Sequence, residues 1–212
     1  MIRFGTEIPA RLYAIAMLCA FLPCIGRNFY MNLILKAELM DEVAVRRAIV
    51  RISHEIIEKN KGTEGVVLVG IRRRGMPIAK MIAENIKLFE DAEAPVGELD
   101  IKFYRDDIRP EHRDPTVTPS KLPFDVNGMR VVLIDDVMYT GRTARAAIEA
   151  VFAQGRPNCI QLAVLIDRGH RELPIRADYV GKNVPTSKSE VISVHVPEYD
   201  GELCVNLLQR TE

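Results

Sequence analysis

Two adjacent aspartates, Asp135 and Asp136, stand shortly before a Tyr-Thr-Gly-Arg-Thr turn, and these residue types at this spacing suit a sugar phosphate. Backbone N–H groups of the turn, loosened by its glycine and aided by its threonine hydroxyls, can surround a phosphate at a helix N-terminus. The carboxylates would repel a phosphate but accept hydrogen bonds from a diol, so they suit the 2′- and 3′-hydroxyls of a ribose. Helix capping is the alternative, but it explains neither the adjacent pair nor the full turn. We expect phosphate binding at Tyr139, Thr140, Gly141, Arg142 and Thr143.

A second turn carries concentrated positive charge. Arg72, Arg73 and Arg74 follow the apolar run 66–70, and a helical pattern begins at Pro77. Guanidinium groups and open backbone amides offer charge-assisted hydrogen bonds that strengthen as a leaving group gains charge. A solvated basic turn is the alternative. We expect this turn to bind pyrophosphate beside the aspartate pair.

The elements that position these turns alternate between strands and helices. Buried strands are expected at 66–70, 131–134 and 160–166, a half-exposed strand at 99–104, and the first helix from Asp41 to about Asn60. This alternation predicts an α/β fold with a mostly parallel sheet flanked by helices, and ligands at the carboxyl ends of its strands. The polar stretch 105–123 is expected to be a flexible lid loop or disordered.

Composition limits the other possibilities. The chain has 212 residues, and 29 Lys and Arg balance 29 Asp and Glu, so overall charge drives it onto neither nucleic acid nor membrane. Any such binding must come from a local patch. The four cysteines show neither metal spacing nor a disulfide framework, which favours a reducing cytoplasm.

The first 30 residues have a different character. Arg11 opens a short apolar run that ends near Gly26, which is typical of a signal-peptide core and too short to span a membrane. We expect residues 1–30 to be an extension outside the fold, with Met31 as the biological start. The domain is expected to cover 35–212 and to open with the helix that begins at Asp41. A loosely packed amphipathic helix and genuine export are the alternatives.

Several motifs resemble known families. The apolar run, Asp-Asp pair and Thr-Gly-Arg-Thr turn resemble the 5-phosphoribosyl-1-pyrophosphate (PRPP) loop of type I phosphoribosyltransferases. The segment 165–186 is similar to the PyrR family, pyrimidine-operon attenuators that are also uracil phosphoribosyltransferases. Shorter matches lie at 51–55, 69–71, 103–107 and 187–189. The resemblance runs from about Ala37 to near the C-terminus, and implies a small C-terminal hood over the type I fold.

The resemblance implies roles for particular residues. Catalysis would involve Asp135, Asp136 and Arg105 of the lid, while Asp106 would join the turns in binding PRPP. Uracil would be bound by Tyr179 flanking the ring and by main-chain groups of Val180, with Asp167 and Arg168 at the pocket mouth. Tyr179 as an ordinary core residue is the alternative. Mg²⁺ would accompany PRPP, and the reaction would convert uracil and PRPP to UMP and pyrophosphate.

RNA binding is the second implied function. The resemblance predicts UMP-dependent binding to the leader mRNA of a pyrimidine operon, and a homodimer or higher homo-oligomer. The expected RNA-facing residues are Arg51, His54, Lys59, His170, Arg171, Arg176 and Lys182. A uracil salvage enzyme without RNA control is the alternative, and a purine phosphoribosyltransferase is a more distant one.

Overall fold

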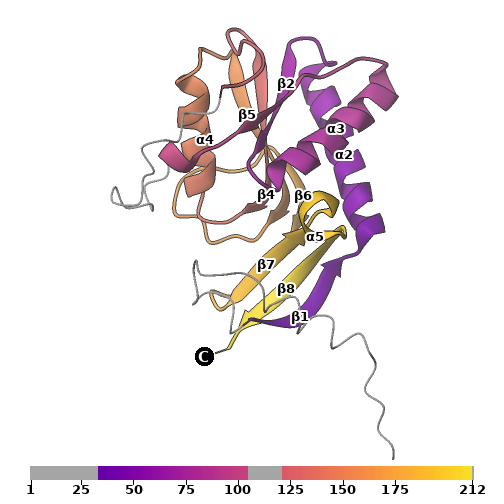
Figure 1. The fold of residues 1–212 in the computed structure, drawn as a ribbon, viewed down its shortest axis with the longest axis vertical. Coiled ribbons are helices and arrows are strands. Elements are labelled where there is room, and N and C mark those ends of the chain that lie inside the picture. Colours follow the sequence, from indigo (N-terminus) through magenta and orange to yellow (C-terminus); the bar gives the residue numbers. More distant parts are fainter. Residues whose placement is uncertain (1–32, 105–120, 212) are drawn as a thin grey trace, which may run out of the picture.

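The structure, a computed structural model, describes residues 33–104 and 121–211 and contains two sheets (Figure 1). The five-stranded central sheet has the order β3-β2-β4-β5-β6, and all of its strand pairs are parallel. Its strands are β2 (Val66–Ile71), β3 (Val96–Leu99), β4 (Arg130–Met138), β5 (Cys159–Asp167) and β6 (Tyr179–Asn183). The predicted α/β class with a parallel sheet is confirmed.

Helices cover both faces of this sheet, so its central strands are buried on both sides. The helices are α2 (Glu42–Asn60), α3 (Gly75–Glu90) and α4 (Arg142–Phe152). One core lies between the sheet and α2 and α3, and includes Leu68 and Ile134. A second core lies under α4 and includes Val67 and Leu133. Burial on both faces explains why β2 reads as an unbroken apolar run.

Helix α2 begins and ends where the sequence indicates. The Asp41 carboxylate accepts a hydrogen bond from the Ala44 N–H at 2.8 Å, which caps the first turn. At the other end, Lys61 adopts the left-handed conformation with φ 55°, and its N–H bonds the carbonyls of the last turn. The predicted helix is confirmed.

Two expectations about neighbouring elements are wrong. The strand expected at 99–104 is absent: β3 ends at Leu99, and a 3-10 turn covers Lys102–Tyr104. The alternation of apolar residues arises because Leu99 and Ile101 both pack into the core under α4. The element that opens the domain is also a strand rather than a helix, β1 (Leu33–Met40).

The hood is an antiparallel sheet of three strands with the order β1-β8-β7. It comprises β1, β7 (Glu190–His195), the short helix α5 (Pro197–Asp200) and β8 (Cys204–Arg210). Met40 pairs with Val205, and Val205 pairs with Val194, so the buried residues of all three strands face the core under α2. The hood is therefore built from both ends of the described chain. Within those residues, no helix combines the length and apolar character that crossing a membrane requires.

Glu190 ties the hood together and gives it a predictable response to acid. Lys36 of β1 and the Ser187 N–H both donate to its carboxylate. The Lys36 hydrogen bond is the main reason that the pKa of Glu190 falls from 4.5 to about 2. Because the folded-state pKa is depressed, this stabilisation is present above about pH 4.5 and is lost as the pH falls toward 2.

We therefore expect Glu190→Gln to lower the Tm at neutral pH and to flatten the fall of the Tm between about pH 4.5 and pH 2. Thermal melts at a series of pH values measure both effects. Glu198→Gln, an exposed position on α5, is the control. Parallel melting curves for Glu190→Gln and the unmodified protein across this range would contradict the expectation.

Candidate active site

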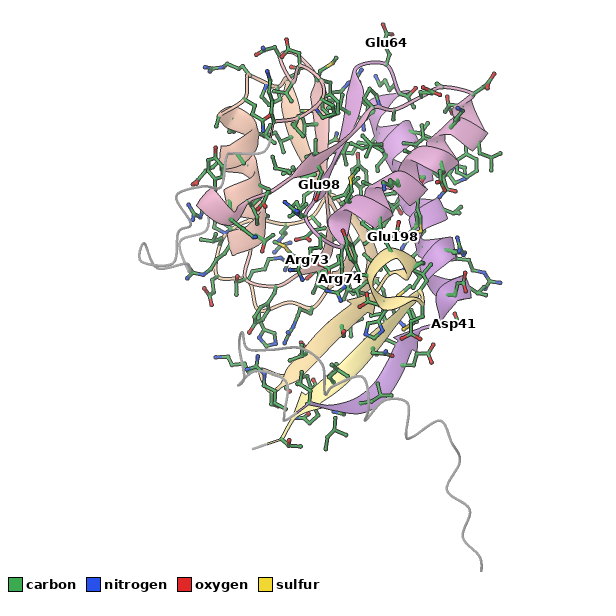
Figure 2. The ribbon with its side chains drawn as sticks, in the orientation of Figure 1. Asp41, Glu64, Arg73, Arg74, Glu98 and Glu198 are labelled. Carbon is green, nitrogen blue, oxygen red and sulfur yellow. The ribbon has the colours of Figure 1, made fainter. Side chains whose placement is uncertain are left out.

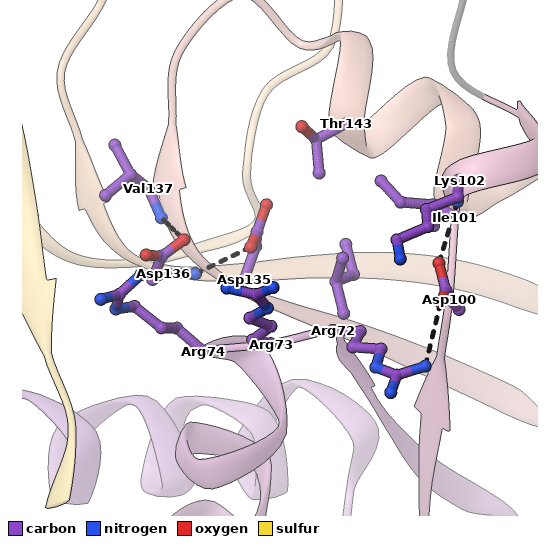
Figure 3. A pocket seen from close by; sticks show the side chains of 11 residues that line it. Arg72, Arg73, Arg74, Asp100, Ile101, Lys102, Asp135, Asp136, Val137 and Thr143 are labelled. Atoms are coloured by element: carbon purple, nitrogen blue, oxygen red, sulfur yellow. Dashed lines mark hydrogen bonds and ion pairs between the residues drawn. The ribbon is translucent and has the colours of Figure 1, made fainter. Parts of the chain in front are cut away.

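The two expected ligand-binding turns lie side by side at the carboxyl edge of the central sheet. β2 and β4 are adjacent parallel strands, with Gly70 opposite Ile134, so the turns that follow them meet. They form a pocket of about 430 Å³ (Figure 3). Its lining is Ile71, Arg72, Arg73, Arg74, Asp100, Ile101, Lys102, Asp135, Asp136, Val137 and Thr143. The structure thus brings together the three arginines and the two aspartates, as expected.

Gly75 allows the close approach of these turns. A Cβ atom at this position would lie 2.2 Å from the Ile134 carbonyl oxygen, directly before the aspartate pair. Only a residue without a side chain fits between the start of α3 and β4 at this distance. The preceding turn contains a cis peptide bond between Arg72 and Arg73.

The aspartate pair is held by its own backbone. The Asp136 N–H donates to the Asp135 carboxylate at 3.0 Å, and the Val137 N–H donates to the Asp136 carboxylate at 2.9 Å. Burial raises the pKa of Asp136, while Asp135 and the positive charge of Arg74 offset part of that rise. Figure 3 shows the Arg74 guanidinium beside the Asp136 carboxylate. The pocket therefore places hydrogen-bond acceptors next to concentrated positive charge.

The Thr-Gly-Arg-Thr turn forms a second hollow of about 260 Å³. Its rim is the expected phosphate-binding turn, residues 139–143, and its floor includes Leu162 and Val164 of β5. Gly141 adopts φ 92° at the N-cap of α4, a conformation that favours glycine. Asp135, Val137 and Thr143 line both hollows. The site is one groove that passes from the arginine turn, across the aspartates, to an apolar floor.

Asp200 is a site residue that the sequence did not indicate. It belongs to α5 of the hood, and its carboxylate accepts hydrogen bonds from Arg74 Nη2 at 3.0 and 3.3 Å. Figure 2 shows Arg73 and Arg74 where the central sheet faces the hood, close to the α5 residue Glu198. Among the described residues, Arg74 Nε is the buried side-chain polar atom that lacks a hydrogen-bond partner. The hood thus fixes the Nη2 end of the Arg74 guanidinium.

We expect Asp200→Asn to raise about fivefold the KM for PRPP, the substrate that the sequence resemblance implies, because a partly exposed ion pair contributes about 1 kcal/mol. The asparagine can still accept the Val196 N–H that Asp200 accepts at 2.9 Å, so α5 is expected to stay folded. Steady-state kinetics at saturating base measure the effect, with Glu198→Gln as the control. A KM equal to that of the unmodified protein would show that Asp200 does not position Arg74.

Asp100 and Lys102 are also pocket residues that the sequence reading missed. Arg72 donates to the Asp100 carboxylate at 3.0 Å, and the Lys102 N–H donates to the other oxygen at 3.0 Å. Asp100 directly follows β3 at the same carboxyl edge of the sheet. That position alone could have indicated a ligand-binding residue, because ligands bind at the carboxyl ends of parallel strands. It was overlooked because the strand was expected to continue through it. The expected lid residues Arg105 and Asp106 lie outside the described residues.

The structure corrects the expected position of Tyr179. Its side chain is buried on the α2 face of the sheet, whereas the pocket floor at Leu162 and Val164 lies on the α4 face. The Tyr179 hydroxyl donates to Gln161 at 2.9 Å, and burial raises its pKa to about 12. The tyrosine is therefore a core residue, and it lines neither of the two hollows.

The other expected base-pocket residues lie nearer the site. Val180 packs on the α4 face, and its carbonyl accepts a hydrogen bond from Arg51 at 3.0 Å. Arg168 is buried, donates to Thr186 and to the carbonyl of Glu190, and lies 4.1 Å from the Tyr139 ring centroid. It therefore connects the hood to the phosphate-binding turn.

Asp167 joins this connection through the Arg171 guanidinium and the Gly169 N–H. Its carboxylate is buried at the end of β5, so it fixes the chain that leads away from the pocket. Neither Asp167 nor Arg168 lines the two hollows.

The expected RNA-facing residues fall into separate groups. Where α2 packs against β6, Arg51 bonds the Gly181 carbonyl, Lys59 pairs with Asp178 and Lys182 bonds the Leu39 carbonyl. Arg176 is exposed in the segment before β6. His54 instead stacks on Phe89 of α3 with ring centroids 4.1 Å apart. His170 and Arg171 lie beyond the end of β5, where His170 bonds the Thr186 carbonyl.

The family of the chain follows from comparison with known proteins. Residues 37–199 match the family model of the phosphoribosyl transferase domain. Bifunctional protein PyrR of Clostridium perfringens is 57% identical over 175 residues, which cover 82% of this chain and 98% of that protein. The chain belongs to the PyrR family. Other PyrR proteins agree: that of Thermus thermophilus is 60% identical over 175 residues, covering 82% of this chain and 97% of its own length.

Solved structures agree with the fold. A hypoxanthine phosphoribosyltransferase of Trypanosoma cruzi is 19% identical, covers 86% of this chain and 94% of its own, and gives a TM-score of 0.65. A hypoxanthine phosphoribosyltransferase of Staphylococcus aureus is 19% identical, covers 82% and 92%, and gives a TM-score of 0.62. These likenesses, together with the parallel sheet, confirm the type I phosphoribosyltransferase fold that the PyrR family shares.

Proposed function

We propose that this protein transfers the phosphoribosyl group of PRPP to uracil, giving UMP and pyrophosphate, and binds the leader mRNA of a pyrimidine operon in response to UMP. The observation that carries the enzymatic part is the groove in which Arg72, Arg73 and Arg74 face the aspartate pair. Along the groove, the basic turn, the aspartate pair and the turn at residues 139–143 follow one another. PRPP has the matching order of a pyrophosphate, a ribose diol and a 5′-phosphate. Membership of the PyrR family supports the regulatory part. Its expected location is the cytoplasm, where its substrates and mRNA occur.

PRPP would lie along the groove with its parts matched to the residues. Backbone N–H groups of residues 139–143 would hold the 5′-phosphate at the start of α4. Asp135 and Asp136 would accept hydrogen bonds from the ribose hydroxyls and so fix the sugar. The pyrophosphate would lie at the arginine turn, where the guanidinium groups that line the pocket offer charge-assisted hydrogen bonds.

Catalysis would then rest on positioning and electrostatics. As the bond between ribose and pyrophosphate stretches, negative charge grows on the leaving group. Arginines fixed before the reaction stabilise that charge without reorganising. Asp200 contributes by fixing Arg74 through two hydrogen bonds. Arg105 and Asp106 are proposed to close over PRPP and to exclude water.

The donor set of the pocket fits Mg²⁺ bound together with PRPP. Asp100, Asp135 and Asp136 supply the hard oxygen ligands, direct or through water, that Mg²⁺ prefers, next to the expected pyrophosphate site. When bound, Mg²⁺ supplies positive charge that neutralises the phosphate oxygens.

The base would lie over the apolar floor formed by Leu162 and Val164. Val180 lies on this face of the neighbouring strand, so its main-chain groups are proposed to read the uracil edge. With Tyr179 in the core, the Tyr139 ring, exposed at the rim, is an aromatic surface next to this floor. The Arg168 guanidinium packs on that ring, with its Cζ 4.1 Å from the ring centroid.

Leader RNA would contact the basic surface where α2 meets β6. Arg51, Lys59 and Lys182 lie there, bonded to the Gly181 carbonyl, Asp178 and the Leu39 carbonyl, and the exposed Arg176 is nearby in the chain. A local cluster of this kind is required because the net charge of the chain is zero. His170 and Arg171 are nearer the phosphate-binding turn, so they are proposed to connect UMP occupancy to the RNA. A homodimer or higher homo-oligomer would enlarge this surface.

A panel of bases tests the enzymatic proposal. Pyrophosphate release from PRPP and Mg²⁺ is measured with uracil, cytosine, hypoxanthine and guanine in turn, and without base. Uracil-dependent release that exceeds the others by at least about tenfold is the expected result. Preference for hypoxanthine or guanine would make the protein a purine phosphoribosyltransferase and contradict the proposal.

A further inference from the structure

Three potential metal ligands meet at the end of the hood that carries α5, and none of them lines either hollow of the groove. His195 is the last residue of β7, Cys204 is the first of β8, and the two are direct partners in the antiparallel ladder. Glu202 stands two residues before Cys204 in the connection between the strands. One donor atom from each of the three residues lies within 4.8 Å of the others.

Contacts inside this cluster fix the orientation of the His195 ring. His195 Nδ1 lies 2.6 Å from Glu202 Oε1, and its Nε2 lies 3.0 Å from the Ser193 hydroxyl. With Nε2 donating to Ser193, Nδ1 is the ring nitrogen left to bind a metal. Cys204 is buried, whereas Glu202 is 60% exposed, so an ion could enter from solvent on the glutamate side.

The local charge also favours a cation. The carboxylates of Glu202 and Glu38 both act electrostatically on the Cys204 sulfur. Asn206 donates weakly to the sulfur at 3.5 Å. Two carboxylates near one sulfur disfavour a thiolate, because three negative charges would lie close together. A divalent cation bound among these groups would offset that repulsion.

We propose that His195, Glu202 and Cys204 form a binding site for a zinc-class divalent cation. Imidazole, thiolate and carboxylate are the ligands that Zn²⁺ uses, and the sulfur selects against Mg²⁺ and Ca²⁺. Metal–ligand distances of about 2.0 to 2.3 Å place tetrahedral donors about 3.3 to 3.6 Å apart. The three donors reach that spacing by small side-chain movements. Water would occupy the fourth position.

A bound ion would cross-link the two ends of the segment 195–202, which contains α5 and reaches the active site. His195 and Glu202 stand on either side of α5, and α5 carries Asp200, which holds Arg74. The proposal does not depend on the base that the enzyme uses, because the cluster contains no residue of the groove.

Titration of the full chain with Zn²⁺ alone, against a chromophoric chelator, tests the site. The expected result is one tightly bound equivalent that Mg²⁺ does not displace. Cys204→Ser and His195→Ala are expected to weaken it by more than about a hundredfold, and Ser193→Ala, which only orients the ring, by about tenfold. Co²⁺ is expected to give a thiolate charge-transfer band that is lost in Cys204→Ser.

The other cysteines provide matched controls. Cys159→Ser, and the double substitution Cys19→Ser with Cys24→Ser, are expected to keep the equivalent and the band. Should Cys204→Ser fail to fold, the exposed Glu202→Gln gives the same comparison without touching the core. The proposal would be overturned if His195→Ala and Glu202→Gln bound Zn²⁺ as tightly as the unmodified protein. It would also be overturned if the double substitution Cys19→Ser with Cys24→Ser abolished Zn²⁺ binding.

Discussion

Asp136→Asn is expected to lower kcat/KM for PRPP by about 10- to 100-fold while leaving the fold intact. Hydrogen bonds to a charged acceptor contribute about 1.5–3 kcal/mol, and each 1.36 kcal/mol is tenfold in rate. The asparagine keeps the shape of the side chain but replaces one of the two carboxylate oxygens proposed to bind the ribose with a donor. Initial rates of uracil-dependent pyrophosphate release at varied PRPP measure the loss.

The stability of the same variant separates this effect from unfolding. Burial raises the pKa of Asp136, so its ionised form is disfavoured in the folded protein and stability falls as the pH rises through that pKa. Replacing it with a neutral isostere is therefore expected to keep the neutral-pH Tm at or above that of the unmodified protein. Asp125→Asn, at an exposed position, is the matched control. Unchanged turnover in Asp136→Asn would count against the assigned role.

Gly75→Ala is expected to destabilise the fold strongly, because among the glycines that the structure describes Gly75 leaves the least room for a methyl group. The added Cβ would lie 2.2 Å from a backbone oxygen of β4, which no side-chain rotation can relieve. Overpacking costs about 1–3 kcal/mol, and a backbone clash lies at the upper end of that range. A cost of about 3 kcal/mol corresponds to a Tm lower by about 6–12 °C for a domain of this size.

The same substitution should also impair PRPP binding, because relief of the clash moves the arginine turn away from Asp135. Thermal melts and the KM for PRPP measure the two effects together. Gly128→Ala is the control: it has φ 70° and open space around it, so it should cost about 1 kcal/mol of stability and leave the KM unchanged. A Gly75→Ala protein with the KM of the control would show that the two turns are not coupled.

The groove was predictable because its parts follow local rules. Each ligand-binding turn directly follows a buried apolar strand, and parallel strands place their carboxyl ends at one edge. Arg72 and Asp135 could therefore be brought together without knowing any side-chain contact. The PyrR resemblance, carried by 165–186, is confirmed by relatives 57% and 60% identical.

What the sequence did not reveal depends on contacts between distant segments. Asp200 bonds Arg74 across 126 positions of sequence, and no local pattern marks such a pair. β1 pairs with β8 at the far end of the chain, so its exposed apolar residues Ile34 and Leu35 gave no clear strand signal. Tyr179 was misplaced because a short edge strand such as β6 does not reveal which of its residues face α2 and which face α4.

The most direct test of the bifunctional assignment is filter binding of the full chain to a structured leader RNA of a pyrimidine operon, with and without UMP at fixed salt. UMP is expected to tighten binding by about 5- to 150-fold, the range of typical coupling between two sites. That result would show that the groove senses the nucleotide and controls the basic surface at α2 and β6. No RNA binding in either condition, with uracil turnover intact, would contradict the regulatory role and leave a salvage enzyme.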